Sequence, residues 1–77
     1  MSIADIKIGK RARVKEFVGG WGLMRKVMAL GIDPGDEVRV VVGMEGRGPF
    51  IIENITKGTK IAMGRGIARK IIVEEIE

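Results

Sequence analysis

The 77-residue chain contains no cysteine, no histidine and no tyrosine. Without cysteine it has no disulfide, no thiolate metal ligand and no thiol nucleophile. Without histidine it lacks the commonest neutral metal ligand and the commonest general base at pH 7. The Lys, Asp and Glu residues form no pattern that indicates acid–base chemistry. The sequence therefore predicts a protein that is not an enzyme and that needs no cofactor.

Aromatic residues and long apolar runs are also scarce. Phe17, Trp21 and Phe50 are the only aromatic residues, which is few for a protein that stacks single-stranded bases on aromatic rings. No apolar run approaches the ~20 residues that a membrane span needs. Asp5 and Lys7 interrupt the position where a signal peptide would have its apolar segment. We therefore expect a cytoplasmic protein.

The charge of the chain is unevenly distributed. The formal net charge is +4, and residues 1–73 carry +7 because three acidic residues close the chain, Glu74, Glu75 and Glu77. Such a basic body suits phosphate groups, an anionic membrane surface or an acidic protein surface. A small basic barrel that binds nucleic acid is therefore the alternative function.

Short alternating segments predict a mainly β fold of about five strands. The strands are expected at residues 10–18, 37–43, 49–55, 59–63 and 70–76. A bulge is expected at residues 16–18, and Val38, Val40 and Val42 are expected on one face of their strand. We interpret residues 1–77 as a single small barrel, an architecture that hides the edges of its sheet.

One short helix is predicted at residues 23–30, after the first strand. Its apolar residues recur at helical spacing, so Met24 and Met28 are expected in the core. If Met24 is instead exposed, its flexible thioether suits an adaptable interface. Gly31 follows the helix, where a residue in the left-handed conformation ends it in a Schellman motif. The dipeptide Pro34–Gly35 then predicts a type II turn.

These features, in this order, resemble the ferrous iron transport protein A (FeoA) family. The matching parts are Gly9 before the first strand, the glycine-rich segment 19–22, the segment 28–35 and the ending built on 61–63, Ala68, Ile71 and Val73. One departure is Ile67, which stands where family members often have an acidic residue. The resemblance implies an SH3-like barrel and a non-enzymatic accessory protein of ferrous iron uptake. Its implied partner is the ferrous iron permease, a membrane protein with a cytosolic GTP-binding domain.

The predicted partner-binding surface lies on the helix and comprises Trp21, Leu23, Met24, Arg25 and Lys26. Trp21 is the sole tryptophan, and tryptophan is enriched at binding hot spots, although it could instead cap the barrel end. The helix start has no Ser, Thr, Asp or Asn cap, which leaves N–H groups free for an acceptor. Arg25 and Lys26 are either a solvated face or a contact to an acidic surface.

The sequence predicts no metal site. Asp33, Asp36 and Glu37 are the closest group of carboxylates, but they lie in a turn where such residues commonly serve as turn formers. The Gly-x-x-Gly segment 43–46 lies between strands, whereas an RNA-clamping loop of this kind lies between helices. An exposed edge strand and the abundant apolar surface also permit a homo-oligomer.

Overall fold

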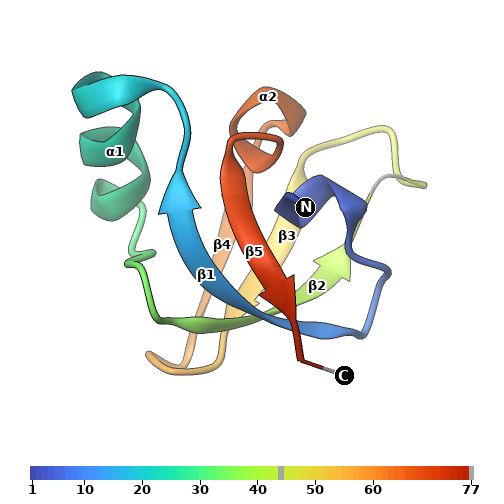
Figure 1. The fold of residues 1–77 in the computed structure, drawn as a ribbon. Coiled ribbons are helices and arrows are strands. Elements are labelled where there is room, and N and C mark those ends of the chain that lie inside the picture. The colour runs from blue at the N-terminus through green and yellow to red at the C-terminus, as the bar shows by residue number, and fades with distance from the viewer. Residues whose placement is uncertain (44, 77) are drawn as a thin grey trace.

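The computed structural model describes residues 1–43 and 45–76. Within them the chain forms one five-stranded antiparallel sheet, two α-helices and a short N-terminal 3₁₀ helix, η1 (Figure 1). The elements, in chain order, are η1 (Ile3–Asp5), β1 (Arg11–Phe17), α1 (Gly20–Ala29), β2 (Glu37–Val42), β3 (Phe50–Asn54), β4 (Thr59–Met63), α2 (Arg65–Ala68) and β5 (Ile71–Glu75). The five strands and the first helix agree with the sequence prediction. The glycine-rich loop expected at residues 43–48 includes Met44, which lies outside the described residues.

The order of strands in the sheet is β4-β3-β2-β1-β5. β1 pairs with β2 through residues 11–13 and with β5 through residues 12–17. The register of β1 against β5 shifts between Val14 and Glu16, so the irregularity begins earlier than the bulge expected at residues 16–18. β1 thus lies between β2 and the last strand, β5, in one curved sheet (Figure 1).

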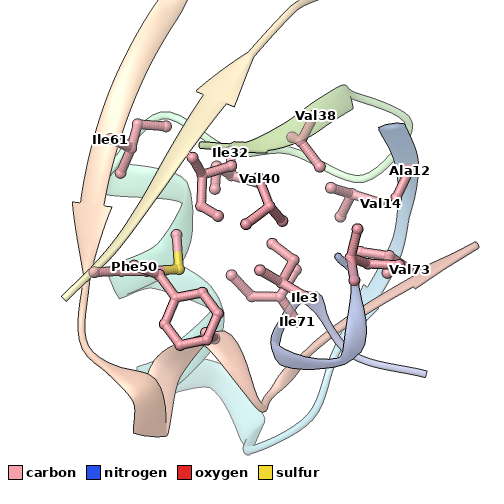
Figure 2. Packing of buried hydrophobic residues seen from close by; sticks show 14 of the residues in the cluster. Ile3, Ala12, Val14, Ile32, Val38, Val40, Phe50, Ile61, Ile71 and Val73 are labelled. Carbon is pink, nitrogen blue, oxygen red and sulfur yellow. The ribbon is translucent and has the colours of Figure 1, made fainter. Parts of the chain in front are cut away.

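The inward faces of the strands and both helices share a single hydrophobic core. Figure 2 shows these side chains converging from all sides on one interior, with Phe50 the largest of them. Its members are Ile3, Ile6, Ala12, Val14, Val27, Ile32, Val38, Val40, Phe50, Ile52, Ile61, Met63, Ala68, Ile71 and Val73. Because Ile3 of η1 and Ile6, which directly follows η1, belong to it, the N-terminal segment is part of this core.

Two residues depart from the sequence prediction: Val42, expected on one face with Val38 and Val40, and Met28, expected in the core. Val42 is 37% exposed, because the register of β2 against β3 shifts between Val40 and Val42 and the alternation of faces is lost there. Met28 is 46% exposed, because Val27 fills the inward direction of the helix at this level. The two reasons differ. Spacing indicates a common face of a strand only while the pairing stays regular, and spacing along a regular helix does not say which side faces the core.

The end of α1 and the following turn agree with the prediction. Gly31 has φ +100°, its N–H donates to the Met28 carbonyl, and the Ile32 N–H donates to the Val27 carbonyl. These are the two hydrogen bonds of a Schellman motif. Gly35 has φ +93°, and the Asp36 N–H donates to the Asp33 carbonyl at 3.1 Å, as in a type II turn.

Candidate partner-binding surface on helix α1

Helix α1 lies in the connection between β1 and β2, at one side of the sheet (Figure 1). It begins at Gly20, three residues before the predicted start, and no side chain caps its N-terminus. Gly19 permits this early start because its φ is +138° and the Leu23 side chain lies over it. A Cβ at position 19 would lie 2.9 Å from Leu23 Cδ2. Glycine at position 19 thus lets Leu23 fold back over the start of the helix.

The five predicted contact residues differ in their exposure. Trp21 is 77% exposed, so it does not cap the end of the barrel. Arg25 and Lys26 are also exposed, and Met24 is half-buried. Leu23 is half-buried and packs against the hydrophobic core. Four of the five side chains are therefore accessible to a partner, and Leu23 contributes mainly to the core.

Met28 is an exposed residue that the sequence prediction assigned to the core. It lies seven residues, or two helical turns, after Trp21, and therefore on the same side of α1. The seven-residue spacing could have indicated from the sequence that Met28 and Trp21 share a side of the helix. Helical spacing by itself does not show whether that side faces the solvent or the core. The exposure of Trp21 in the structure shows that it faces the solvent.

The charges of α1 differ from those of the sheet. Within the part of the chain that the structure describes, Arg25 and Lys26 form no ion pair, and α1 contains no acidic residue. On the sheet, in contrast, basic side chains face acidic ones across strands. The pairs are Arg11–Glu37 at 2.9 Å, Arg39–Glu53 at 3.1 Å and Lys15–Glu74 at 3.9 Å. Arg25 and Lys26 are thus available to a partner, as are exposed basic residues outside α1 that form no ion pair among the described residues, such as Lys10, Arg13 and Lys60.

A polar cluster joins the turn after α1 to the turn between β3 and β4. Asp36 is 6% exposed, and its Oδ2 accepts hydrogen bonds from the Asp33 N–H at 2.9 Å and from Asn54 Nδ2 at 2.9 Å. Lys57 Nζ donates to the same oxygen at 2.7 Å and to Asp33 Oδ2 at 2.5 Å. Asn54 Nδ2 also donates to the Gly31 carbonyl at 2.9 Å. These bonds hold the C-terminal end of α1 against the β3–β4 turn.

The same contacts set the pKa of the two charged partners. Burial opposes ionisation of Asp36, but the hydrogen bond from Lys57 and those from Asp33 and Asn54 together outweigh it, so its pKa lies below the usual 3.8. Hydrogen bonds to Asp33 and Asp36 raise the pKa of Lys57 above 10.5. Lys57 therefore pairs with Asp33 and Asp36, and Arg11 pairs with Glu37, the third carboxylate considered as a metal ligand.

Other kinds of site find no support in the described residues. In residues 1–43 and 45–76, no three or more Asp or Glu side chains gather closely enough to hold a metal ion, and no pocket opens on the surface. Over the same ranges, no helix is both long and apolar enough to cross a lipid bilayer. Helix α1 carries Trp21, the most exposed of the large apolar side chains among the described residues.

The small curved antiparallel sheet around one core places the chain in the SH3-like class of barrel proteins, and in this chain a helix follows the first strand. A family model described as the FeoA domain matches residues 1–75. The curated protein named "Putative Fe(2+) transport protein A" of Methanocaldococcus jannaschii is 40% identical over 75 residues, which cover 97% of this chain and 87% of that protein. The chain therefore belongs to the FeoA family, which is associated with ferrous iron transport.

Two solved structures show the same fold. The FeoA protein of Chlorobium tepidum has a TM-score of 0.82 at 26% identity, and the match covers 100% of this chain and 71% of that one. The zinc-complexed FeoA of Stenotrophomonas maltophilia, described as an SH3 domain protein, has a TM-score of 0.75 at 23% identity, covering 96% and 89% of the two chains. The expected SH3-like barrel and the family resemblance are thus confirmed.

Proposed function

We propose that the protein is a non-enzymatic accessory protein that docks on the cytosolic portion of the ferrous iron permease. The docking surface is the exposed side of α1, formed by Trp21, Met24, Arg25 and Lys26 with Leu23 beneath them. The observation that carries the proposal is the 77% exposure of Trp21, the sole tryptophan, on a helix with unpaired basic residues. Large exposed apolar side chains beside such charges are typical of protein-binding surfaces.

Membership of a family associated with ferrous iron transport supports the choice of partner. The S. maltophilia FeoA has been suggested to act as a bacterial ferrous iron transport activating factor. An accessory protein that activates a transporter needs a surface for contact and no catalytic group. The chain offers such a surface and lacks cysteine and histidine. Docking would bring the barrel to the cytosolic face of the membrane through its partner.

The test combines a binding assay with a transport assay. Wild-type protein and the double variant Trp21→Ala/Arg25→Glu are compared for co-purification with the detergent-solubilised permease of the same source and for support of ferrous iron uptake. We expect the double variant to lose both while its circular dichroism stays unchanged. The matched control is Ile8→Ala/Lys60→Glu, which removes one exposed apolar and one exposed basic residue outside α1. Unchanged uptake in the α1 variant would refute this assignment of the surface.

The nucleic-acid alternative gains no specific support from the structure. Phe50 is buried and Phe17 half-buried, so Trp21 is the one aromatic ring among the described residues with a freely accessible face. Binders of single strands use several such rings along a groove. A nuclease step in the co-purification assay separates the two functions. A permease retained after nuclease treatment supports docking, and recovery of only nuclease-sensitive material supports the alternative.

A further inference from the structure

The outward side of α1 has an apolar stripe with one charge in it. Trp21, Met24, Arg25 and Met28 stand at positions i, i+3, i+4 and i+7, so they follow one another along a single side of the helix. Val27, which is fully buried, stands about 100° or more around the helix from Trp21 and Met28, so these two side chains point away from the core. Surface helices normally expose polar residues on this side. We call the four residues the α1 stripe.

Lys26 does not belong to the α1 stripe. Each residue advances about 100° around a helix, so the side chain of Lys26 points well away from that of Arg25 although the two are neighbours in sequence. Both are exposed and neither forms an ion pair among the described residues. Position on the helix is therefore what distinguishes them.

Arg25 restricts which partners can bind the α1 stripe more than its apolar residues alone would. When a partner covers Trp21 and Met28, it also takes water away from the guanidinium group between them. Desolvating an unpaired charge is costly, and α1 has no acidic residue to compensate it. The compensating carboxylate has to come from the partner.

We infer that the α1 stripe binds an amphipathic segment of the permease's cytosolic portion that carries apolar side chains and an Asp or Glu placed to pair with Arg25. This inference rests on the proposed function and specifies the chemistry of the partner. Arginine binds a carboxylate through two parallel hydrogen bonds, which fixes the orientation of the segment as well as its charge.

Two other occupants fit the stripe less well. A second copy meeting it through the same side would bring Arg25 against Arg25, and neither helix has an acidic residue to pair with it. A membrane-surface helix keeps its basic residues on the polar side, whereas Arg25 stands within the apolar stripe. Charge complementarity therefore favours an acidic protein segment.

Trp21 is the natural reporter of this binding, because it is the only tryptophan of the chain and is exposed. The probes are overlapping synthetic peptides that cover the cytosolic segments of the permease, with any tryptophan replaced by phenylalanine. We expect an acidic, apolar peptide to shift the Trp21 emission to shorter wavelengths in a saturable way. Basic peptides should leave it unchanged.

Arg25→Glu and Lys60→Glu form the matched pair of variants. Both reverse one exposed charge that forms no ion pair among the described residues, and Lys60 lies on β4, outside the proposed surface. We expect Arg25→Glu to lower the affinity for that peptide about tenfold or more and Lys60→Glu to lower it less than about twofold. A peptide whose acidic residue is replaced by lysine should regain affinity for the Arg25→Glu variant, a rescue that a merely misfolded variant would not show.

Other outcomes overturn the inference in recognisable ways. Equal losses in the two variants would mean that only general electrostatic attraction is involved. An emission shift with phosphatidylglycerol vesicles but with no peptide would assign the stripe to lipid, and a shift that depends on protein concentration alone would assign it to a second copy. If the permease co-purifies but no acidic peptide binds, the inference fails and docking stands. If the permease does not co-purify, docking itself fails.

Discussion

Trp21 and Phe50 have opposite environments, although both are large aromatic residues in a chain with few of them. Trp21 is 77% exposed and Phe50 is fully buried at the centre of the core. A side chain contributes to folding mainly through the apolar area that folding removes from water. Trp21 therefore contributes little to the stability of the free protein, and its side chain is available for the docking contact proposed above.

Trp21→Ala should change the free energy of unfolding by less than about 0.5 kcal/mol, whereas Phe50→Ala should lower it by about 3–5 kcal/mol. Denaturant unfolding followed by circular dichroism measures both. The emission maximum of Trp21 should also move little between folded and unfolded protein, because the ring is exposed in both states. A large loss of stability in Trp21→Ala would contradict its assignment to a contact surface.

The polar cluster around Asp36 makes stability depend on pH. Because the pKa of Asp36 is lower in the folded chain than in the unfolded chain, its ionised form stabilises the fold above the unfolded value of about 3.9. That stabilisation is lost as the pH falls through the folded pKa. The raised pKa of Lys57 acts in the other direction, since its stabilisation is present below the unfolded value and is lost as the pH rises through the folded one.

Asp36→Asn should therefore lower the free energy of unfolding at pH 7 by about 1–2 kcal/mol, because the amide cannot accept charged hydrogen bonds equally well. The difference in the free energy of unfolding between Asp36→Asn and wild type should become smaller as the pH falls from 5 to 2. Urea unfolding at a series of pH values measures this difference. Asp33→Asn is the matched control, expected to cost less than about 1 kcal/mol, because that side chain is 43% exposed. A gap that stays constant down to pH 2 would mean that packing, and not ionisation, is responsible.

Helix α1 is ended by backbone conformation more than by side-chain contacts. A Cβ added at Gly31 would lie 3.9 Å from Ile61 Cδ1, an ordinary van der Waals distance, so there is space for a side chain. The φ of +100° is what favours glycine. Gly22 is a useful contrast, because it lies within α1 with open space around it and no positive φ.

Alanine should thus have opposite effects at these two glycines. We expect Gly31→Ala to lower the free energy of unfolding by about 1–2 kcal/mol and Gly22→Ala to raise it by about 0.5–1 kcal/mol. Thermal and denaturant unfolding of the two variants provide the measurement. Equal effects would show that the Schellman motif does not determine where α1 ends.

The strands could be predicted from the sequence because each one alternates between core and solvent. Alternation located β4 at residues 59–63 and placed Val38 and Val40 inside. It failed at Val42, since a shift of register depends on the neighbouring strand and not on local spacing. The location of a bulge is therefore a property of the paired strands.

The candidate surface could be predicted only in part. The composition of the segment and the missing N-terminal cap indicated that α1, with Trp21, is the partner-binding surface. Which residues of α1 share the outward side depended on where the sheet holds the helix, so Met28 was assigned to the core and Leu23 to the surface. A ten-residue helix with apolar residues on two sides has two orientations of similar hydrophobicity, and tertiary packing decides between them.

At the scale of the whole molecule, the N-terminal segment covers one edge of the sheet, β5. β5 is covered by the N-terminal segment, since Ser2 forms a bridge with Ile72 and the Val73 N–H donates to the Met1 carbonyl at 2.9 Å. The capping box of Ser2 and Asp5 fixes η1 in this position. The N-terminal segment thus has two roles: it covers an edge strand, and it contributes side chains to the core.

Ile3 is important both for the core and for the cover of β5, because it is fully buried and belongs to η1 in the segment that covers this strand. Ile3→Ala should lower the free energy of unfolding by about 2–5 kcal/mol, a large part of the 5–15 kcal/mol typical of a domain. Exposure of the β5 edge should also make this variant associate at high concentration, which size-exclusion chromatography measures. Ile3→Val keeps most of the side chain and should cost only about 0.5–1.5 kcal/mol while staying unassociated. If Ile3→Ala unfolds at the same denaturant concentration as wild type, the N-terminal segment folds independently of the barrel and the single-core description is wrong.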